Sequence, residues 1–262
     1  MSAGETQTME MLLRQLKLPG FAAHYAEQAK KAEKQGLSHT AFLRTLVELE
    51  LEERRARRIE RLLKASELPS EKTLATLTLE KLPPKVRRQL PSLCEGGFLE
   101  RAENVLAFGL PGRGKTHLAC ALGHELVKRG HSVLFTTAVL LVQRLLVAKK
   151  ELRLEEELRR LDGFDAVILD DIGYIQQDRE EMEVLFTFLA ERYERRSVII
   201  TSNLVFSQWD RIFKDPMTTA AAIDRVVHHS VILEMSGPSV RSEAAAKREQ
   251  AESKQRKPEA EA

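Results

Sequence analysis

Aromatic residues and cysteines are scarce in this sequence. Aromatic residues make up 5% of the 262 positions, and the cysteines are Cys94 and Cys120 alone. Because few aromatic rings could stack on bases, binding of nucleic acid through its backbone and shape is favoured over base reading. The cysteines form neither a CxxC pair nor a metal-ligand spacing, which favours a reduced, cytoplasmic compartment.

A long apolar run and an excess of one charge are also missing. The longest apolar candidate, residues 138–148, is interrupted by Gln143 and Arg144, and residues 1–10 lack the apolar core of a signal peptide. We therefore expect a soluble, cytoplasmic protein with no membrane partner. The formal net charge is +2, so any DNA binding must depend on local basic patches rather than on the average charge.

The first part of the sequence is predicted to be helical. Within residues 1–66 the apolar residues recur at helical spacing, and Pro19-Gly20 interrupts the pattern. Gly36 suits the end of a second helix. The sequence therefore predicts a small all-helical N-terminal domain.

The expected third helix of that domain carries many charges. Glu50 and Arg54 are four positions apart with the acid first, the order that favours an ion pair on an exposed face. Five arginines lie between residues 54 and 61. They form either a DNA-binding patch or a solvated face balanced by glutamates.

The rest of the sequence divides into a linker, a core and a tail. Residues 67–103 contain four prolines and predict a linker with a short helix near 84–93. From 104 to 242 short apolar strands alternate with helices, which predicts an α/β domain whose parallel sheet lies between helices. Residues 243–262 hold no large apolar side chain and are expected to be disordered or a frayed helix. The expected strands are 105–108, 132–136, 166–169, 198–201 and 231–233.

A glycine-rich stretch follows the first expected strand. Residues 109–116 match the phosphate-binding pattern G-x-x-x-x-G-K-[ST] in full, between a strand and a helix. The glycines let backbone N–H groups wrap phosphates, and the start of the next helix adds its own N–H groups. Lys115 is expected to contact the β- and γ-phosphates, and the Thr116 hydroxyl to reach Mg²⁺. The residues expected to bind nucleotide here are Gly109, Pro111, Gly112, Arg113, Gly114, Lys115, Thr116 and His117.

Two aspartates follow a later apolar strand. The apolar residues 167–169 lead into Asp170 and Asp171, as in a Walker B motif. Asp170 is expected to hold Mg²⁺, directly or through water, together with Thr116. Asp171 is expected to act as the general base that orients the attacking water.

Three further polar residues are candidates for roles around the phosphates. Asn203 follows the next strand, and ligands of parallel sheets bind at the carboxyl ends of strands, so Asn203 is expected to reach the γ-phosphate or its water. Arg225 either completes the site of a neighbouring subunit or is a surface residue paired with Asp224. Arg241 is either a second phosphate sensor or a solvated residue of the tail.

Several longer stretches of the sequence are distinctive. They are Leu16–Gly20, Gly114–Ala119, Phe135–Ala138, Ala190–Ser197, Thr201–Leu204 and Asp224–Ser230. Through these stretches the chain, from Leu16 to Arg241, resembles the IstB-type transposition helper ATPases of bacterial insertion sequences. That family belongs to the AAA+ P-loop NTPases and is related to the helicase loader DnaC.

The resemblance implies an ATP-dependent protein that assembles on duplex DNA as a homo-oligomer, deforms it and recruits or activates a cognate transposase. It implies ATP and Mg²⁺ at subunit interfaces, hydrolysis that resets the assembly, and association with the nucleoid. Asn203 matches the sensor-one position, Arg225 the arginine finger and Arg241 the sensor-two position. Asp171 stands where a catalytic glutamate is common, which is compatible with slow hydrolysis, and Arg113 stands where a small polar residue is frequent.

Basic residues after the second expected strand are candidates for DNA contacts. In the helicase-loader relatives the corresponding region faces the DNA. Contacts of this kind mostly reach phosphates, which fix position without reading sequence. The candidates are Arg144, Lys149, Lys150 and Arg153.

Other functions stay open at this point. A replicative helicase loader of the DnaC type shares every site residue, and only its partner protein differs. A nucleotide-gated binding module that hardly hydrolyses ATP is compatible with Asp171. A small-molecule kinase would need an acceptor pocket and an arginine-rich lid, neither of which the sequence indicates, and the position of Asn203 argues against it.

Overall fold

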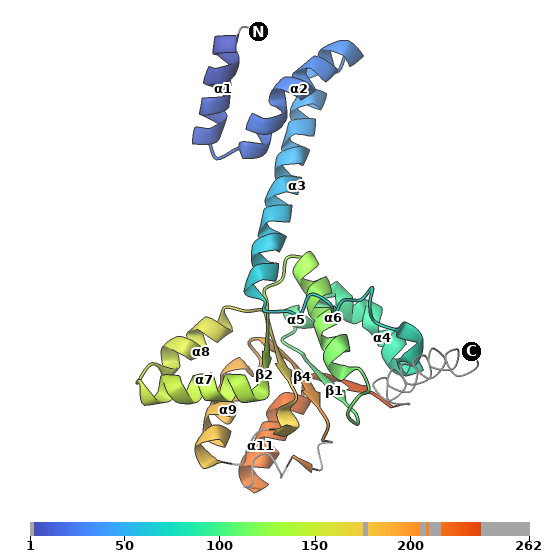
Figure 1. Ribbon diagram of the computed structural model, residues 1–262, viewed down its shortest axis with the longest axis vertical. Coiled ribbons are helices and arrows are strands. Elements are labelled where there is room, and N and C mark those ends of the chain that lie inside the picture. The colour runs from blue at the N-terminus through green and yellow to red at the C-terminus, as the bar shows by residue number, and fades with distance from the viewer. Residues whose placement is uncertain (1–2, 175–177, 205–207, 210–215, 237–262) are drawn as a thin grey trace, which may run out of the picture. The chain divides into compact units, whose positions relative to one another are not determined.

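The computed structural model describes residues 3–174, 178–204, 208–209 and 216–236. The chain forms two compact units, residues 1–61 and 62–262, and each is described by itself (Figure 1). The proposed domain boundary after residue 66 lies a few residues beyond this division. The tail expected to be disordered lies outside the described residues.

The N-terminal unit consists of helices α1 (Ala3–Gln15), α2 (Pro19–Gln35) and most of α3 (His39–Ala65). Residues 62–65 at the end of α3 belong to the C-terminal unit. Lys17 has the left-handed φ of 56° and turns the chain after α1. Pro19 and Gly20 belong to the first turn of α2. Proline is tolerated there because the backbone N–H that it lacks would have no partner within the helix. The two residues therefore begin a helix as well as interrupting the preceding pattern. Gly36, with φ 63°, ends α2 as predicted.

Glu50 corrects one expectation from the sequence. Its side chain is buried, with 3% of the residue exposed, and does not lie on a solvated face of α3. Oε2 accepts hydrogen bonds from the backbone N–H groups of Gly20 (2.7 Å) and Phe21 (3.3 Å), and Oε1 accepts one from Arg54 Nε (2.6 Å). Because the first N–H groups of a helix have no partner within it, this carboxylate caps α2 from α3.

The C-terminal unit is built on a five-stranded sheet in the order β2-β3-β4-β1-β5, with every neighbouring pair parallel. The predicted parallel α/β domain is therefore confirmed. The strands are β1 (Asn104–Phe108), β2 (Val133–Thr137), β3 (Ala166–Asp170), β4 (Ser197–Ser202) and β5 (Ser230–Glu234). The helices are η1 (Leu79–Lys81), α4 (Pro84–Glu95), α5 (Gly97–Glu100), α6 (Lys115–Lys128), α7 (Ala138–Lys150), α8 (Leu154–Asp162), η2 (Ile172–Tyr174), α9 (Arg179–Arg192) and α11 (Pro216–Val227).

Helices cover both faces of this sheet (Figure 1). Helices α7, α9 and α11 pack on one face and share a core with residues such as Leu106, Val167 and Ile200. Helix α6 packs on the other face, where Gly123 allows close approach: a Cβ there would lie 2.7 Å from Ile168 Cδ1. Since strands β3, β4 and β1 are neighbours and run in the same direction, their carboxyl ends meet at one edge of the sheet.

Among the described residues, no helix is both long enough and apolar enough to cross a membrane.

Candidate nucleotide-binding site

The glycine-rich loop lies between β1 and α6, as the sequence predicts. Gly112 and Gly114 have φ values of 78° and 82°, in the left-handed region that favours glycine. Gly114 is the N-cap of α6, and no side chain caps this helix. The first N–H groups of α6 are therefore open to an anion, and the positive end of the helix dipole favours one.

Lys115 lies inside this loop and is only 5% exposed. Its Nζ atom donates hydrogen bonds to the carbonyl oxygens of Gly109 (2.7 Å) and Leu110 (3.1 Å). These neutral acceptors hold the ammonium group inside the glycine-rich loop. A phosphate in the loop would offer it charged acceptors, which form stronger hydrogen bonds than carbonyls.

Asp170 and Asp171 lie at the end of β3, beside the end of β4. Asp170 is 6% exposed, and its Oδ1 atom accepts a hydrogen bond of 2.6 Å from the Thr201 hydroxyl. The same hydroxyl accepts a hydrogen bond of 2.9 Å from the backbone N–H of Asp171. Asp171 has φ 56°, an uncommon value for a residue other than glycine. Thr201 therefore fixes the side chain of one aspartate and the backbone of the other.

Two polar atoms near the loop are buried without a hydrogen-bond partner in the described part of the chain: Asn203 Oδ1 and Arg113 Nη1. Gly173 packs against Asn203, and a Cβ at residue 173 would overlap its Oδ1 atom. Buried polar groups are usually paired, so orphaned ones indicate a missing ligand or water. An acceptor and a donor beside the loop fit a phosphate together with a water molecule.

One pocket brings most of the predicted site residues together. It is lined by residues 111–117 of the loop and α6, by Asp171 and Asn203, and by Lys72 from the linker. Asp170 lies next to Asp171 at the end of β3. Lys72 and Thr201 were not predicted to be site residues from the sequence, although Thr201 belongs to a stretch that resembles the family.

Two predicted arginines are not among the residues that line this pocket. The Arg225 guanidinium lies over the ring of Phe186, 4.7 Å from its centroid, in a cation–π contact between α11 and α9. Its role as an arginine finger in a neighbouring subunit stays a prediction. Arg241 lies outside the described residues.

The oxygen atoms at the site fit the Mg²⁺ ion that accompanies a bound nucleotide. Among the described residues, no group of three or more His, Cys, Asp or Glu side chains could hold a metal ion. Magnesium in nucleotide sites is usually held by one or two carboxylates, water and substrate phosphates. Asp170 offers one such carboxylate, and the Thr116 hydroxyl offers a further oxygen ligand. The second oxygen of Asp170 has no hydrogen-bond partner among the described residues.

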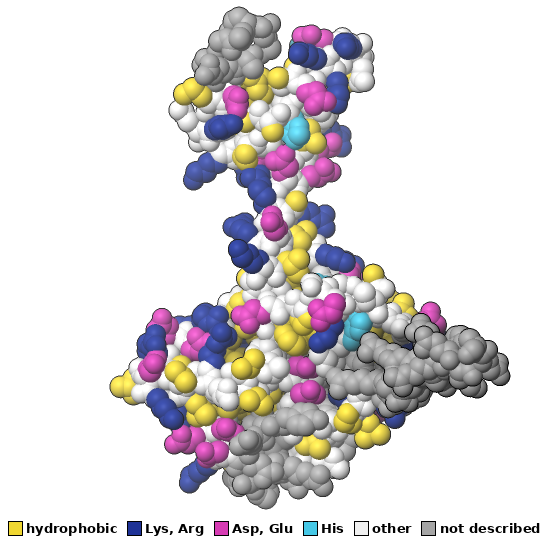
Figure 2. All heavy atoms as spheres, in the orientation of Figure 1, with side chains coloured by type: hydrophobic (Ala, Val, Ile, Leu, Met, Phe, Trp, Pro, Cys, Tyr) yellow, Lys and Arg dark blue, Asp and Glu magenta, His cyan; other side chains and the backbone are white. Residues whose placement is uncertain are grey.

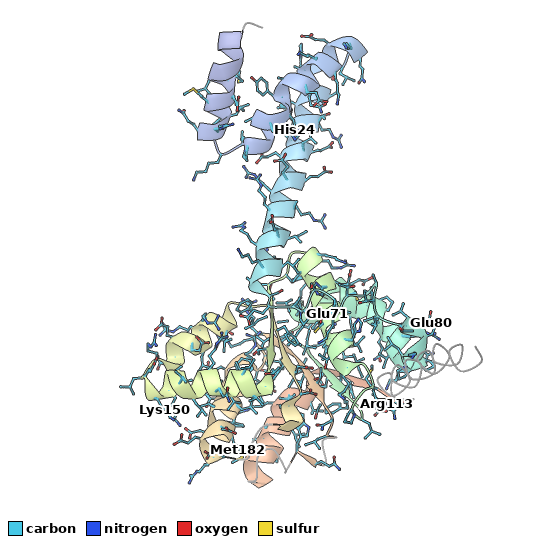
Figure 3. All side chains as sticks on the ribbon, viewed as in Figure 1. His24, Glu71, Glu80, Arg113, Lys150 and Met182 are labelled. Atoms are coloured by element: carbon cyan, nitrogen blue, oxygen red, sulfur yellow. The ribbon has the colours of Figure 1, made fainter. Side chains whose placement is uncertain are left out.

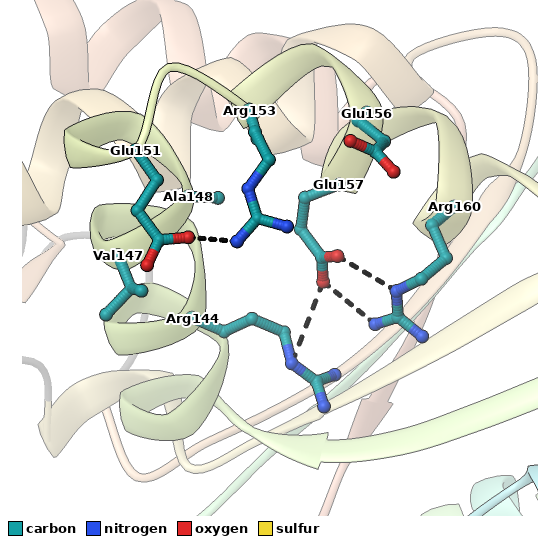
Figure 4. Close-up of a pocket in the computed structure, with 8 residues that line it drawn as sticks. All are labelled: Arg144, Val147, Ala148, Glu151, Arg153, Glu156, Glu157 and Arg160. Carbon is teal, nitrogen blue, oxygen red and sulfur yellow. Dashed lines mark hydrogen bonds and ion pairs between the residues drawn. The ribbon is translucent and has the colours of Figure 1, made fainter.

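The four DNA candidates lie on α7 and the turn that leads to α8. Figure 4 shows two of them, Arg144 and Arg153. Arg144 lies 3.6 Å from Glu157, Lys149 lies 3.0 Å from Glu183, and Arg153 is paired with Glu151. Lys150 is exposed and makes no ion pair with a described residue. Basic and acidic side chains are intermixed over this region, and Lys150 lies on the other side of the C-terminal unit from Arg113 (Figures 2 and 3). The patch is therefore close to charge balance, and DNA contact by these residues stays a prediction.

The sequence and its relatives define the family. A model of the IstB-like ATP-binding proteins matches residues 11–249. The chain belongs to this family. An insertion-sequence ATP-binding protein of Sinorhizobium fredii is 43% identical over 90% of this chain and 79% of its own length. The ATP-binding protein of insertion sequence IS21 from Pseudomonas aeruginosa is 40% identical over 89% of this chain and 88% of its own length.

Solved structures agree with the family in fold. The replication initiator DnaA bound to AMPPCP and single-stranded DNA is 19% identical, with a TM-score of 0.55 over 66% of this chain and 52% of that one. DnaI is 21% identical, with a TM-score of 0.55 over 65% of this chain and 96% of that one. Identities this low support a common fold alone, that of the AAA+ P-loop proteins. Membership of the IstB-like family makes the chain an ATP-binding protein associated with insertion sequences.

Proposed function

We propose that this chain is an ATP-dependent, DNA-binding helper ATPase for transposition. It assembles on target duplex DNA as a homo-oligomer, deforms the DNA and recruits or activates the transposase of its insertion sequence. The observation that carries the proposal is one pocket that joins residues 111–116 of the P-loop to Asp171 and Asn203, in a chain that belongs to the IstB-like family.

In the binding step, the loop N–H groups and the start of α6 surround the phosphates of ATP. Lys115 moves from the carbonyls of Gly109 and Leu110 to the β- and γ-phosphates. Arg113 donates to the same phosphates, which is supported by its buried Nη1 atom having no partner among the described residues. Thr116 and Asp170 would hold Mg²⁺, which would offset the negative charge of the phosphates.

In the hydrolytic step, Asp171 accepts a proton from the attacking water as general base. Asn203 Oδ1 accepts a hydrogen bond from that water and thereby orients it. Thr201 keeps Asp170 and the backbone of Asp171 in place. An aspartate reaches less far than a glutamate, so we expect slow hydrolysis, which suits a protein that remains assembled until hydrolysis resets it.

Assembly and DNA contact complete the proposal. Arg225 acts as an arginine finger toward ATP bound by the neighbouring subunit, which makes assembly depend on nucleotide. The basic residues of α7 and the following turn contact DNA phosphates. Since three of them are paired with acids, these contacts require exchange of ion pairs, which makes Lys150 the most available cation of the four.

The deciding experiment measures DNA binding and sedimentation of the full chain with no nucleotide, with ADP and with a non-hydrolysable ATP analogue. Lys115→Ala serves as the variant without nucleotide binding. We expect large assemblies on duplex DNA only with the ATP analogue, and none with Lys115→Ala. A wild-type chain that binds ATP but ignores duplex DNA in every state contradicts the proposal. Binding to a replicative helicase would then be the next measurement.

A further inference from the structure

The first part of the linker is fastened to the helix that follows the P-loop. We call residues 66–76 the linker loop. His124 Nε2 lies 3.0 Å from the carbonyl oxygen of Pro69, and His117 Nε2 lies 3.1 Å from that of Thr73. Because a carbonyl oxygen only accepts, both histidines carry their proton on Nε2 and donate it to the loop. Two histidines of α6, two turns apart, therefore hold the loop along this helix.

The loop is also ordered internally. The Thr76 hydroxyl lies 2.7 Å from the carbonyl oxygen of Glu71 and 3.0 Å from His117 Nε2. It accepts a hydrogen bond of 3.0 Å from the backbone N–H of Thr73. Lys72 lies inside this closed turn, and its own N–H donates to the Pro69 carbonyl at 3.2 Å. The backbone that carries Lys72 is thus held on both sides.

Lys72 reaches the pocket that contains the P-loop. Lys72 lines that pocket together with Lys115, Thr116 and Asp171. The residue is partly buried, and its side chain forms no hydrogen bond or ion pair with any described residue, its neighbour Glu71 included. Glu71 lies beside α6 (Figure 3). Burial raises the pKa of Cys120 on α6 to about 12, and the charge of Lys72 opposes this rise.

The path of the loop shows which end of the nucleotide Lys72 would meet. The loop starts at the edge of the sheet, where Phe135 N on β2 donates to the Ser66 carbonyl oxygen at 2.7 Å. Strand β2 is the neighbour of β3, which ends in Asp170, whereas β5 lies at the opposite edge. In P-loop NTPases the Walker B aspartate lies near the metal that joins the β- and γ-phosphates. The loop therefore approaches from the side of the terminal phosphate.

We propose that Lys72 is a nucleotide-binding residue that contacts the terminal phosphate of ATP, so that the linker loop, besides the P-loop, distinguishes ATP from ADP. The inference rests on the proposed function, because it assumes that ATP occupies the P-loop pocket. Lysine suits the role, since it acts as a compact point charge on phosphate oxygens.

The test is binding of fluorescent ATP and ADP analogues, with Mg²⁺, to the full chain and to Lys72→Met. Methionine keeps the length of the side chain and removes its charge. We expect ATP affinity to fall about 10-fold, the loss of one charged hydrogen bond, and ADP affinity to change less than about 2-fold. Lys72→Arg keeps the charge and retains most of the preference for ATP. Lys85→Met, an exposed lysine on α4 outside the pocket, is the matched control and binds both nucleotides as wild type does.

Hydrogen exchange of residues 66–76 accompanies the titrations and is expected to be unchanged in Lys72→Met. If Lys72→Met binds ATP as tightly as wild type, or loses ATP and ADP equally, the inference is overturned. The proposed function survives either result as long as wild type binds ATP and Lys115→Ala does not. If wild type binds neither nucleotide, the proposed function itself fails.

Discussion

Two buried carboxylates, one in each unit, have opposite surroundings. Glu50 of the N-terminal unit is 3% exposed, and its two oxygens accept hydrogen bonds from two backbone N–H groups and from Arg54. Asp170 of the C-terminal unit is 6% exposed, and among the described residues only the Thr201 hydroxyl is hydrogen-bonded to its side chain. Both carboxylates are buried, but the hydrogen bonds from described residues saturate Glu50 and leave acceptor capacity on Asp170.

The difference distinguishes a carboxylate with a structural role from one that we propose to bind a ligand. A buried charge is costly unless it is paired and hydrogen-bonded. Glu50 meets this cost through α2, so removing it damages the packing of the unit. Asp170 meets only part of it through the described residues, and in the proposed function Mg²⁺ and its nucleotide supply the rest. Substitution of Glu50 should therefore lower the stability of the N-terminal unit, whereas substitution of Asp170 should lower the rate of ATP hydrolysis.

The largest effect is expected from Glu50→Ala. The change leaves the buried N–H of Gly20 without an acceptor, at about 1–3 kcal/mol, and removes the acceptor of the partly buried N–H of Phe21. We expect the packing of α2 on α3 to lose about 2–4 kcal/mol, measured by hydrogen exchange of residues 19–35 in the full chain. Glu52→Ala, an exposed glutamate of the same helix, should stay within about 0.5 kcal/mol of wild type. Equal protection in both variants would show that Glu50 does not hold α2.

Asp170→Asn should act on chemistry and not on the fold. An asparagine side chain still accepts the Thr201 hydroxyl but lacks the charge that holds Mg²⁺. We expect ATP hydrolysis in single-turnover assays to fall at least about 100-fold, with an unchanged melting temperature. The matched control is Asp178→Asn, because Asp178 is the N-cap of α9 and asparagine caps helices equally well. Hydrolysis at the wild-type rate in Asp170→Asn would assign the metal to another residue.

Thr201→Val tests how Asp170 and Asp171 are positioned. Valine has the shape of threonine without the hydroxyl, so it frees Asp170 and leaves the Asp171 N–H without its acceptor. We expect hydrolysis to fall about 10–100-fold, the usual range for a residue that orients a metal ligand, while ATP binding changes little. Thr201→Ser keeps the hydroxyl and should restore most of the rate. Loss of binding and hydrolysis together would indicate a general structural role instead.

The motifs that were predicted well are local ones. The strand, glycine loop and helix around residues 104–128 follow each other directly, so glycine positions, the lysine and the apolar strand could be recognised without any distant contact. The alternation of strands and helices likewise fixes a parallel sheet, and that sheet brings the ends of β3 and β4 together. Asp171 and Asn203 reach the P-loop pocket for this reason.

The residues whose roles could not be predicted from the sequence are positioned by contacts with residues far along the chain. Glu50 has the same spacing to Arg54 whether that pair is solvated or caps a helix, and only the packing of α2 decides between them. Lys72 lies in a proline-punctuated segment without periodicity, and its loop is placed by His117 and His124, which follow it by more than forty positions. No local pattern signals a contact of that kind.

The smallest expected effect concerns the protonation of Glu50. Burial alone raises the pKa of this carboxyl, but hydrogen bonds from Arg54, Gly20 and Phe21 and the charge of Arg54 outweigh burial and hold the pKa below its ordinary value of 4.5. A lowered pKa means that the ionised form stabilises the folded state above the ordinary pKa, and that this contribution is lost as the pH falls through the folded value. Exchange protection of residues 19–35 should therefore decline on acidification, and Glu50→Gln should decline less steeply than Glu52→Gln. If the two variants decline in parallel, the acid sensitivity of the N-terminal unit comes from its exposed carboxylates, and Glu50 caps α2 equally well without a charge.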